Sequence, residues 1–156
     1  MKKILFILSI STIFLLGLSS CYKTCEDPMA SNYTLKGDCI DATTSVVGNY
    51  SGTFLDSVPG VHSTTSQITI QITKVDDSHV QVTASTNAFI GFTAAVSSSS
   101  NGYYLTVPSQ TSSGATVVGA GTYFGNAADG VYVTATRQIT IYTLVGGLYE
   151  GFIGVQ

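Results

Sequence analysis

The chain has 156 residues, of which 44% are hydrophobic and only 10% charged, and its formal net charge is −3. A single arginine and no cluster of basic residues argue against a nucleic-acid partner. The abundance of Thr, Ser, Gly, Val and Tyr is typical of an all-β secreted domain.

Residues 1–20 have the pattern of a secretory signal peptide. Lys2 and Lys3 precede an apolar run that extends to Leu18, and small residues follow it. Polar residues interrupt the run, which makes it marginal for a membrane-spanning helix. A retained anchor helix is the less favoured alternative.

The cleavage region resembles the bacterial lipobox, in which an aliphatic residue and two small residues precede a cysteine. Here these residues are Leu18, Ser19, Ser20 and Cys21. The resemblance implies a diacylglycerol on the Cys21 thiol and cleavage before Cys21, and two or more acyl chains anchor a protein stably. Ordinary secretory cleavage near Ser20 is the alternative. We expect attachment to the outer membrane, because Tyr22 is not the Asp that signals inner-membrane retention in some bacteria.

Lipidation of Cys21 would leave an even pair of cysteines, Cys25 and Cys39. Exported chains meet an oxidising compartment, where such a pair normally closes. A loop of about 15 residues closed in this way gains roughly 3 kcal/mol in the chain-entropy treatment. The mature chain would carry four basic residues against nine acidic ones, a net charge of −5.

Residues 21–45 are expected to form a tether. The stretch 25–33, CEDPMASNY, resembles a short module of secreted Bacteroidetes proteins with the pattern Cys-x-Asp-Pro-x-Ala-x-Asn-Tyr and a second Cys downstream. The resemblance implies a disulfide-closed spacer. A calcium site made by Glu26, Asp27, Asp38 and Asp41 is the alternative to solvated acids, and its spacing does not match an EF-hand. Residues 41–45 would be a linker.

From Val46 onward, apolar and polar residues alternate as in half-buried strands, most clearly in QITIQIT at 67–73. The predicted strands are 46–55, 66–74, 78–84, 88–96, 102–107, 114–124, 131–144 and 147–155. The strand at 131–144 has a candidate break near Thr136, and residues 126–129 could form one helical turn. Asp76-Asp77-Ser78 and Gly146-Gly147 are expected to be hairpin turns.

Short connections predict an antiparallel up-and-down meander of about eight strands, either closed into a small barrel or folded into two packed sheets. Closure removes exposed edges, so we favour the barrel, formed by residues 46–156. The opening VGNYSGTF at 47–54 and the closing Tyr149-Glu150-Gly151-Phe152 resemble calycin-like (lipocalin-like) β-barrel lipoproteins of the Bacteroidetes. That resemblance implies a calycin-like barrel.

No catalytic set is evident, so we expect a protein that is not an enzyme and has no cofactor or metal. His62 and His79 are interpreted as surface residues, because no nucleophile motif accompanies them. Most aromatic residues should fill the core, but some could contact a ligand; the candidates are Tyr104, Tyr123, Tyr132 and Tyr142. Asp56-Ser57-Val58 resembles a Bacteroidetes O-glycosylation sequence, which makes Ser57 a candidate modification site.

These features predict a lipid-anchored cell-envelope protein whose small barrel binds an apolar or glycan ligand, or a protein partner. The alternative is a structural or assembly component of the outer membrane with no small-molecule ligand.

Overall fold

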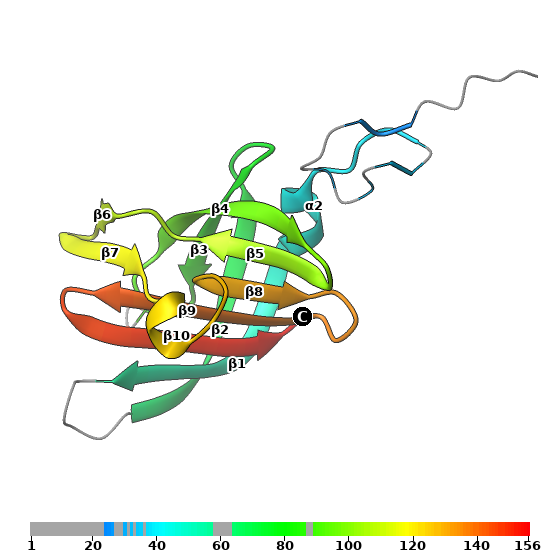
Figure 1. The fold of residues 1–156 in the computed structure, drawn as a ribbon. Helices are drawn as coiled ribbons and strands as arrows, with labels where there is room; N and C mark the ends of the chain where they lie inside the picture. Colours follow the sequence, from blue (N-terminus) through cyan, green and yellow to red (C-terminus); the bar gives the residue numbers. More distant parts are fainter. Residues whose placement is uncertain are drawn as a thin grey trace, which may run out of the picture.

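The computed structural model describes residues 24–26, 30, 32, 34–35, 37–57, 64–86 and 89–156. Within these ranges, the chain forms β-strands joined by short turns, with one short α-helix and one 3-10 helix (Figure 1). In chain order, the elements are α2 (Ala42–Val46), β1 (Gly48–Ser57), β2 (Thr64–Lys74), β3 (His79–Ala84), β4 (Phe92–Ser99), β5 (Gly102–Thr106), β6 (Gln110–Ser112), β7 (Ala115–Gly119), η1 (Gly121–Phe124), β8 (Gly130–Val133), β9 (Gln138–Val145) and β10 (Leu148–Val155).

Eight strands form a closed antiparallel barrel. They pair in the order β10-β1-β2-β3-β4-β5-β8-β9, and the pairing of β9 with β10 closes the ring. The predicted all-β barrel of about eight strands is therefore confirmed, and the two-sheet alternative is wrong. The hairpin β6–β7 is additional, and β7 pairs with β9 beyond the end of β8.

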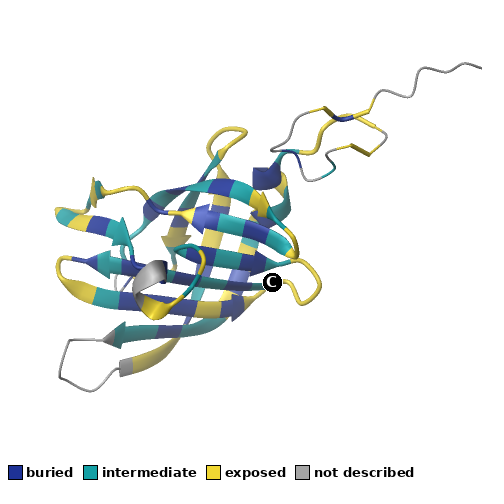
Figure 2. Ribbon diagram, viewed as in Figure 1, coloured by how far each residue is buried: buried dark blue, intermediate teal, exposed yellow. Residues whose placement is uncertain are grey.

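More and less buried residues alternate along the strands of the barrel wall, as the period-two pattern predicts (Figure 2). In β9, the inward residues Ile139, Ile141, Thr143 and Val145 are buried, whereas the residues between them are half-buried on the outer face. Each fully buried aliphatic side chain contributes about 1.5–3 kcal/mol relative to exposure. The alternation thus determines which face of each strand points inward, and the inward residues form the core.

Aromatic rings bridge the interior at two levels. Tyr50 of β1 contacts Tyr132 of β8 edge-on, with ring centroids 6.1 Å apart, and Tyr132 stacks on Tyr103 at 6.1 Å. At the second level, Phe89 lies between Phe54 of β1, at 5.8 Å, and Phe92 of β4, at 5.7 Å. Tyr50 and Tyr132 come from β1 and β8, which are not neighbours in the wall, and all six rings are buried, so they occupy the interior at both levels.

The barrel has two different ends, which we name the tether end and the far end. The tether end carries α2 and the turns β2–β3, β4–β5 and β8–β9; the far end carries the β6–β7 hairpin and the β9–β10 turn (Figure 1). Figure 1 shows the described residues just before α2 on the side of the barrel away from the far end.

The helix α2 lies where the sequence predicts a linker, and it packs on the barrel. Ala42 and Val46 belong to the hydrophobic core, and the Tyr50 hydroxyl donates a hydrogen bond of 2.8 Å to the Val46 carbonyl. Lys74 at the end of β2 forms an ion pair of 2.6 Å with Asp41. Five residues are too few to show a helical period, so periodicity could not find this helix.

The tether contains the predicted disulfide, which joins Cys25 to Cys39. The Asn32 side chain donates a hydrogen bond of 2.8 Å to the Asp38 carbonyl and accepts one of 2.7 Å from the Ile40 amide, so it links two parts of the tether. No group of three or more His, Cys, Asp or Glu among the described residues could hold a metal ion. In the same part of the chain, no helix combines the length and the apolar character needed to cross a membrane.

Several strand boundaries differ from prediction. The strand predicted from residue 88 begins at Phe92, and the segment 114–124 divides into β7 and η1. The strand β6 was not predicted, and the helical turn expected at 126–129 lies earlier, in η1. The hairpin turns at 75–78 and 146–147 and the break near Thr136, at 134–137, are confirmed.

Candidate functional site

Two carboxyl groups face each other inside the far end of the barrel. Asp56 of β1 lies directly opposite Glu150 of β10 in the strand register. Asp56 is two residues from the buried Phe54, and Glu150 is two residues from the buried Phe152. Since residues two apart in a strand share a face, both carboxyl groups project inward.

Each of these carboxyl groups has one buried oxygen without a hydrogen-bond partner. Glu150 is only 8% exposed, yet its Oε2 atom has no hydrogen-bond partner, and neither has the buried Oδ1 atom of Asp56. Asp129, also toward this end, differs: its carboxylate accepts hydrogen bonds from the amides of Val107, at 2.9 Å, and Gly121, at 3.2 Å. Buried polar atoms are usually paired, so the Asp56–Glu150 pair is an exception that needs an explanation.

No described basic side chain neutralises this pair. In residues 42–156, the basic residues other than histidine are Lys74 and Arg137. Lys74 pairs with Asp41 and Asp77, and Arg137 lies in the β8–β9 turn, so both belong to the tether end. Burial, and secondarily the charge of Asp56, raises the pKa of Glu150 to about 7.

This shift makes stability depend on pH. The usual pKa of 4.5 applies to Glu150 in the unfolded chain, so the folded chain holds the proton more tightly between pH 4.5 and 7. We therefore expect the free energy of unfolding to fall as pH rises through this range and to level off above pH 7. On its two neighbouring strands, Glu150 faces Asp56 and Thr143, of which only Asp56 has an ionisable side chain.

The variant Glu150→Gln should remove this part of the pH dependence, because it replaces the ionisable carboxyl group by a neutral amide. At pH 8 the variant should exceed the wild type in stability by about 1–2 kcal/mol, a modest gain because solvent near the half-buried Asp56 screens the charge that is removed. Urea unfolding at pH 5 and pH 8, followed by circular dichroism, measures the difference. Parallel pH profiles for the wild type and the variant would contradict the expectation.

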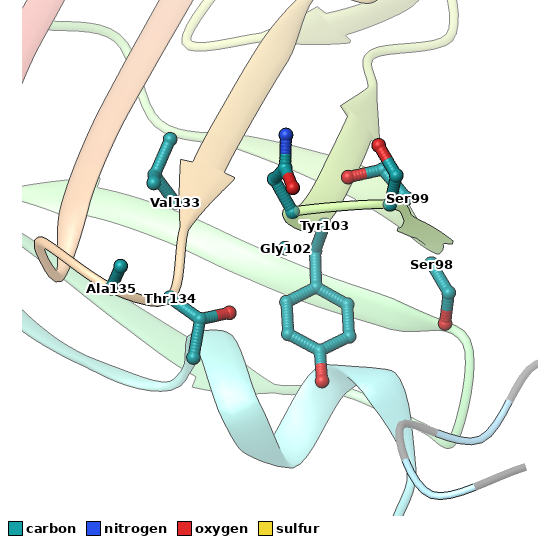
Figure 3. Close-up of a pocket in the computed structure, with 9 residues that line it drawn as sticks. Ser98, Ser99, Gly102, Tyr103, Val133, Thr134 and Ala135 are labelled. Carbon is teal, nitrogen blue, oxygen red and sulfur yellow. The ribbon is translucent and has the colours of Figure 1, made fainter.

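A groove of about 730 Å³ lies at the tether end between the β4–β5 hairpin and the β8–β9 turn (Figure 3). Its walls are neutral, with hydroxyl and amide groups beside the aliphatic Val133; the polar groups come from Ser98, Ser99, Ser100, Asn101, Tyr103 and Thr134. Such a surface suits a neutral polar ligand. Tyr103 adds little contact area, because it is only 7% exposed and its ring stacks on Tyr132.

The structure does not bring the candidate ligand-contacting tyrosines together. Tyr132 is buried inside the barrel, whereas Tyr104 and Tyr142 are half-buried on its outer face. Tyr142 stacks on Phe124 with centroids 4.8 Å apart, and Phe124 also meets Tyr149 edge-on at 5.4 Å. The side chain of Tyr123 lies outside the described part of the structure.

The other predicted residues lie apart from the carboxyl pair. Ser57 ends β1, but its side chain is not described, and His62 and Cys21 lie outside the described residues. His79 begins β3 at the tether end, where its Nδ1 atom lies 3.0 Å from Asp76 and 3.0 Å from the Ser78 hydroxyl. A catalytic triad uses opposite nitrogens of the imidazole for these two contacts, so this arrangement is that of a hydrogen-bonded turn.

The Asp76 carboxylate satisfies donors of this turn. It accepts hydrogen bonds of 2.8 Å from the amides of Ser78 and His79. The Ser78 amide, followed by the His79 side chain, lowers the pKa of Asp76 to about 2. The acid next to His79 is thus engaged in local structure.

Comparison with protein-family models, with curated proteins and with solved structures finds no match to this chain. Among the described features, the carboxyl pair is the candidate site, because its buried oxygens are the polar atoms that lack partners. Sequence reasoning missed both residues. The signal that could have found them is the strand phase, which places Asp56 in line with Tyr50 and Phe54, and Glu150 in line with Phe152.

Proposed function

We propose that this chain is a lipid-anchored protein of the cell envelope, held on the outer membrane through Cys21, whose barrel is not an enzyme and binds a ligand or a protein partner at its far end. The lipobox and the signal-peptide pattern of residues 1–20 support the anchor. The clearest support for the orientation is that the tether joins the barrel at the end opposite the carboxyl pair.

This arrangement suits presentation of a binding end away from a bilayer. The tether is cross-linked by its disulfide and fixed to β2 by the ion pair between Asp41 and Lys74. The helix α2 packs at the same end with core residues Ala42 and Val46. A lipid on Cys21, four residues before Cys25, would therefore keep the tether end toward the membrane.

The filled interior favours a second candidate, a structural or assembly role with no small-molecule ligand. The rings of Tyr50 and Tyr132 meet across the barrel, and Phe89 links Phe54 to Phe92. A large apolar ligand would have to displace these rings. Recovery of one stoichiometric protein partner from detergent-solubilised membranes, unchanged by substitutions at the carboxyl pair, would support this second role.

The anchor is tested by Cys21→Ser in the full chain expressed in a Gram-negative host. We expect the wild type in the membrane fraction with an incorporated fatty-acid label, and the variant in the soluble fraction without the label, because the thiol is the site of acylation. Cell fractionation and radiolabelled palmitate measure both properties.

The matched control is Cys25→Ser, which removes the disulfide but keeps the lipobox cysteine. This variant should stay in the membrane fraction with its label. A wild-type chain that is soluble and unlabelled, or a Cys21→Ser variant that remains membrane-bound, would contradict the proposal.

A further inference from the structure

We propose that the far end of the barrel is a binding site for a primary alkylammonium group, held between the carboxylates of Asp56 and Glu150. This inference names the ligand chemistry for the proposed binding role and rests on that role. Its starting observation is that two inward carboxyl groups, opposite each other on β1 and β10, each have a buried oxygen with no partner.

Once Glu150 has lost its proton, a cation is the partner that these atoms lack. An ionised carboxylate only accepts hydrogen bonds, and two facing carboxylates repel each other. The described chain supplies no cation here, because Lys74 is bound to Asp41 and Asp77 and Arg137 lies at the tether end. A ligand with positively charged N–H donors would satisfy the free oxygens and relieve the repulsion.

The geometry favours an ammonium group over a guanidinium group. A guanidinium fork fits the two oxygens of one carboxylate, whereas here the free oxygens belong to two carboxylates on different strands. An ammonium group has three donors that point in different directions and can bridge two acceptors. A metal ion such as Ca²⁺ takes six to eight oxygen ligands, and the described residues offer no third acidic or imidazole ligand nearby.

The surroundings suit an alkyl chain on that ammonium. The inward neighbours of the pair along the same two strands are the buried aromatic residues Phe54 and Phe152. Asp56 is half-buried, and Glu150 is only 8% exposed. Phe54 and Phe152 would border the first carbons of an alkyl chain attached to that ammonium.

Protonation should regulate this site. Because the pKa of Glu150 is raised to about 7, its carboxyl group is mostly ionised at pH 8 and mostly protonated at pH 5.5. Binding should therefore weaken as pH falls.

The test is titration calorimetry of n-butylammonium into the mature lipoprotein in a non-ionic detergent, at pH 8 and low salt. We expect saturable binding, no binding of the neutral analogue butan-1-ol, and weaker binding at pH 5.5. Glu150→Gln and, separately, Asp56→Asn should each weaken binding about tenfold or more, because each removes a charge-assisted hydrogen bond. Circular dichroism verifies that each variant is folded.

The matched control is Asp77→Asn, which removes one negative charge at the tether end and should leave the affinity unchanged. Absence of saturable butylammonium binding at pH 8, equal affinities for the wild type and both site variants, or tighter binding of Ca²⁺ that blocks butylammonium would overturn the proposal. The membrane location of Cys21→Ser is independent of these outcomes, so failure of this site and failure of the anchor are distinguishable.

Discussion

The substitution Tyr50→Ala should destabilise the barrel by about 3–5 kcal/mol, because it empties the level of the core near the tether end. Tyr50 is fully buried, contacts Tyr132 across the barrel and bonds to the Val46 carbonyl of α2. Burial also raises the pKa of its hydroxyl above the usual value, in keeping with its low exposure. Single domains are stable by only about 5–15 kcal/mol, so this loss is large.

Guanidinium unfolding followed by far-UV circular dichroism measures the effect. The conservative variant Tyr50→Phe keeps the ring and removes only the hydroxyl, and we expect it to cost about 1 kcal/mol through the unpaired Val46 carbonyl. If Tyr50→Ala and Tyr50→Phe have equal stabilities, the ring does not fill the core as described.

Most of the barrel could be predicted from the sequence because one face of its wall faces solvent and the other faces the core. The residues 67–73 alternate without interruption, and in the structure Ile68, Ile70 and Ile72 are buried while Gln67, Gln71 and Thr73 are exposed. A shift of one residue in the register of such a strand would move its apolar side chains from the core to solvent. The pattern therefore determines both that the segment is a strand and which face of it is buried. The turns at 75–78 and 146–147 could also be predicted, because their Asp, Ser and Gly residues are typical of hairpin turns.

Elements that depend on distant contacts could not be predicted in this way. The helix α2 has only five residues, and its burial comes from packing against β2 and β4. The strand β6 has three residues and is defined by its pairing with β7. Gln110 of β6 also donates to the Thr93 carbonyl at 2.7 Å, a contact across 17 residues that no local pattern encodes.

The candidate site was missed for a related reason. Asp56 and Glu150 are 94 positions apart in the sequence, and only closure of the barrel places β1 beside β10. The tyrosines were candidates for ligand contact because exposed rings often bind ligands, yet Tyr132 fills the core. A strand phase that places an acidic residue on the dry face is a better indicator of a site than an aromatic residue on an unassigned face.

The second large effect is expected for Gly52→Ala, which should destabilise the barrel by about 3 kcal/mol or more. Gly52 of β1 lies opposite Gly154 of β10, at the pairing that brings the first and last strands together. A methyl group at Gly52 would overlap the backbone of Ile153 and Gly154, and backbone atoms cannot move aside as a flexible side chain can. Relief would require β1 and β10 to separate.

The control for this prediction is Ser51→Ala, the preceding residue of the same strand, whose exposed side chain should tolerate the change within about 0.5 kcal/mol. Unfolding midpoints in guanidinium compare the two variants, and a Gly52→Ala protein as stable as Ser51→Ala would show that β1 and β10 do not approach this closely.

The motif Gly-x-Tyr-x-Gly at 48–52 then has a physical basis at two of its positions. Tyr50 fills the core, and Gly52 lets β1 and β10 approach closely enough to pair. The same pairing aligns Asp56 with Glu150, so a barrel that cannot close at Gly52 would also lose the carboxyl pair.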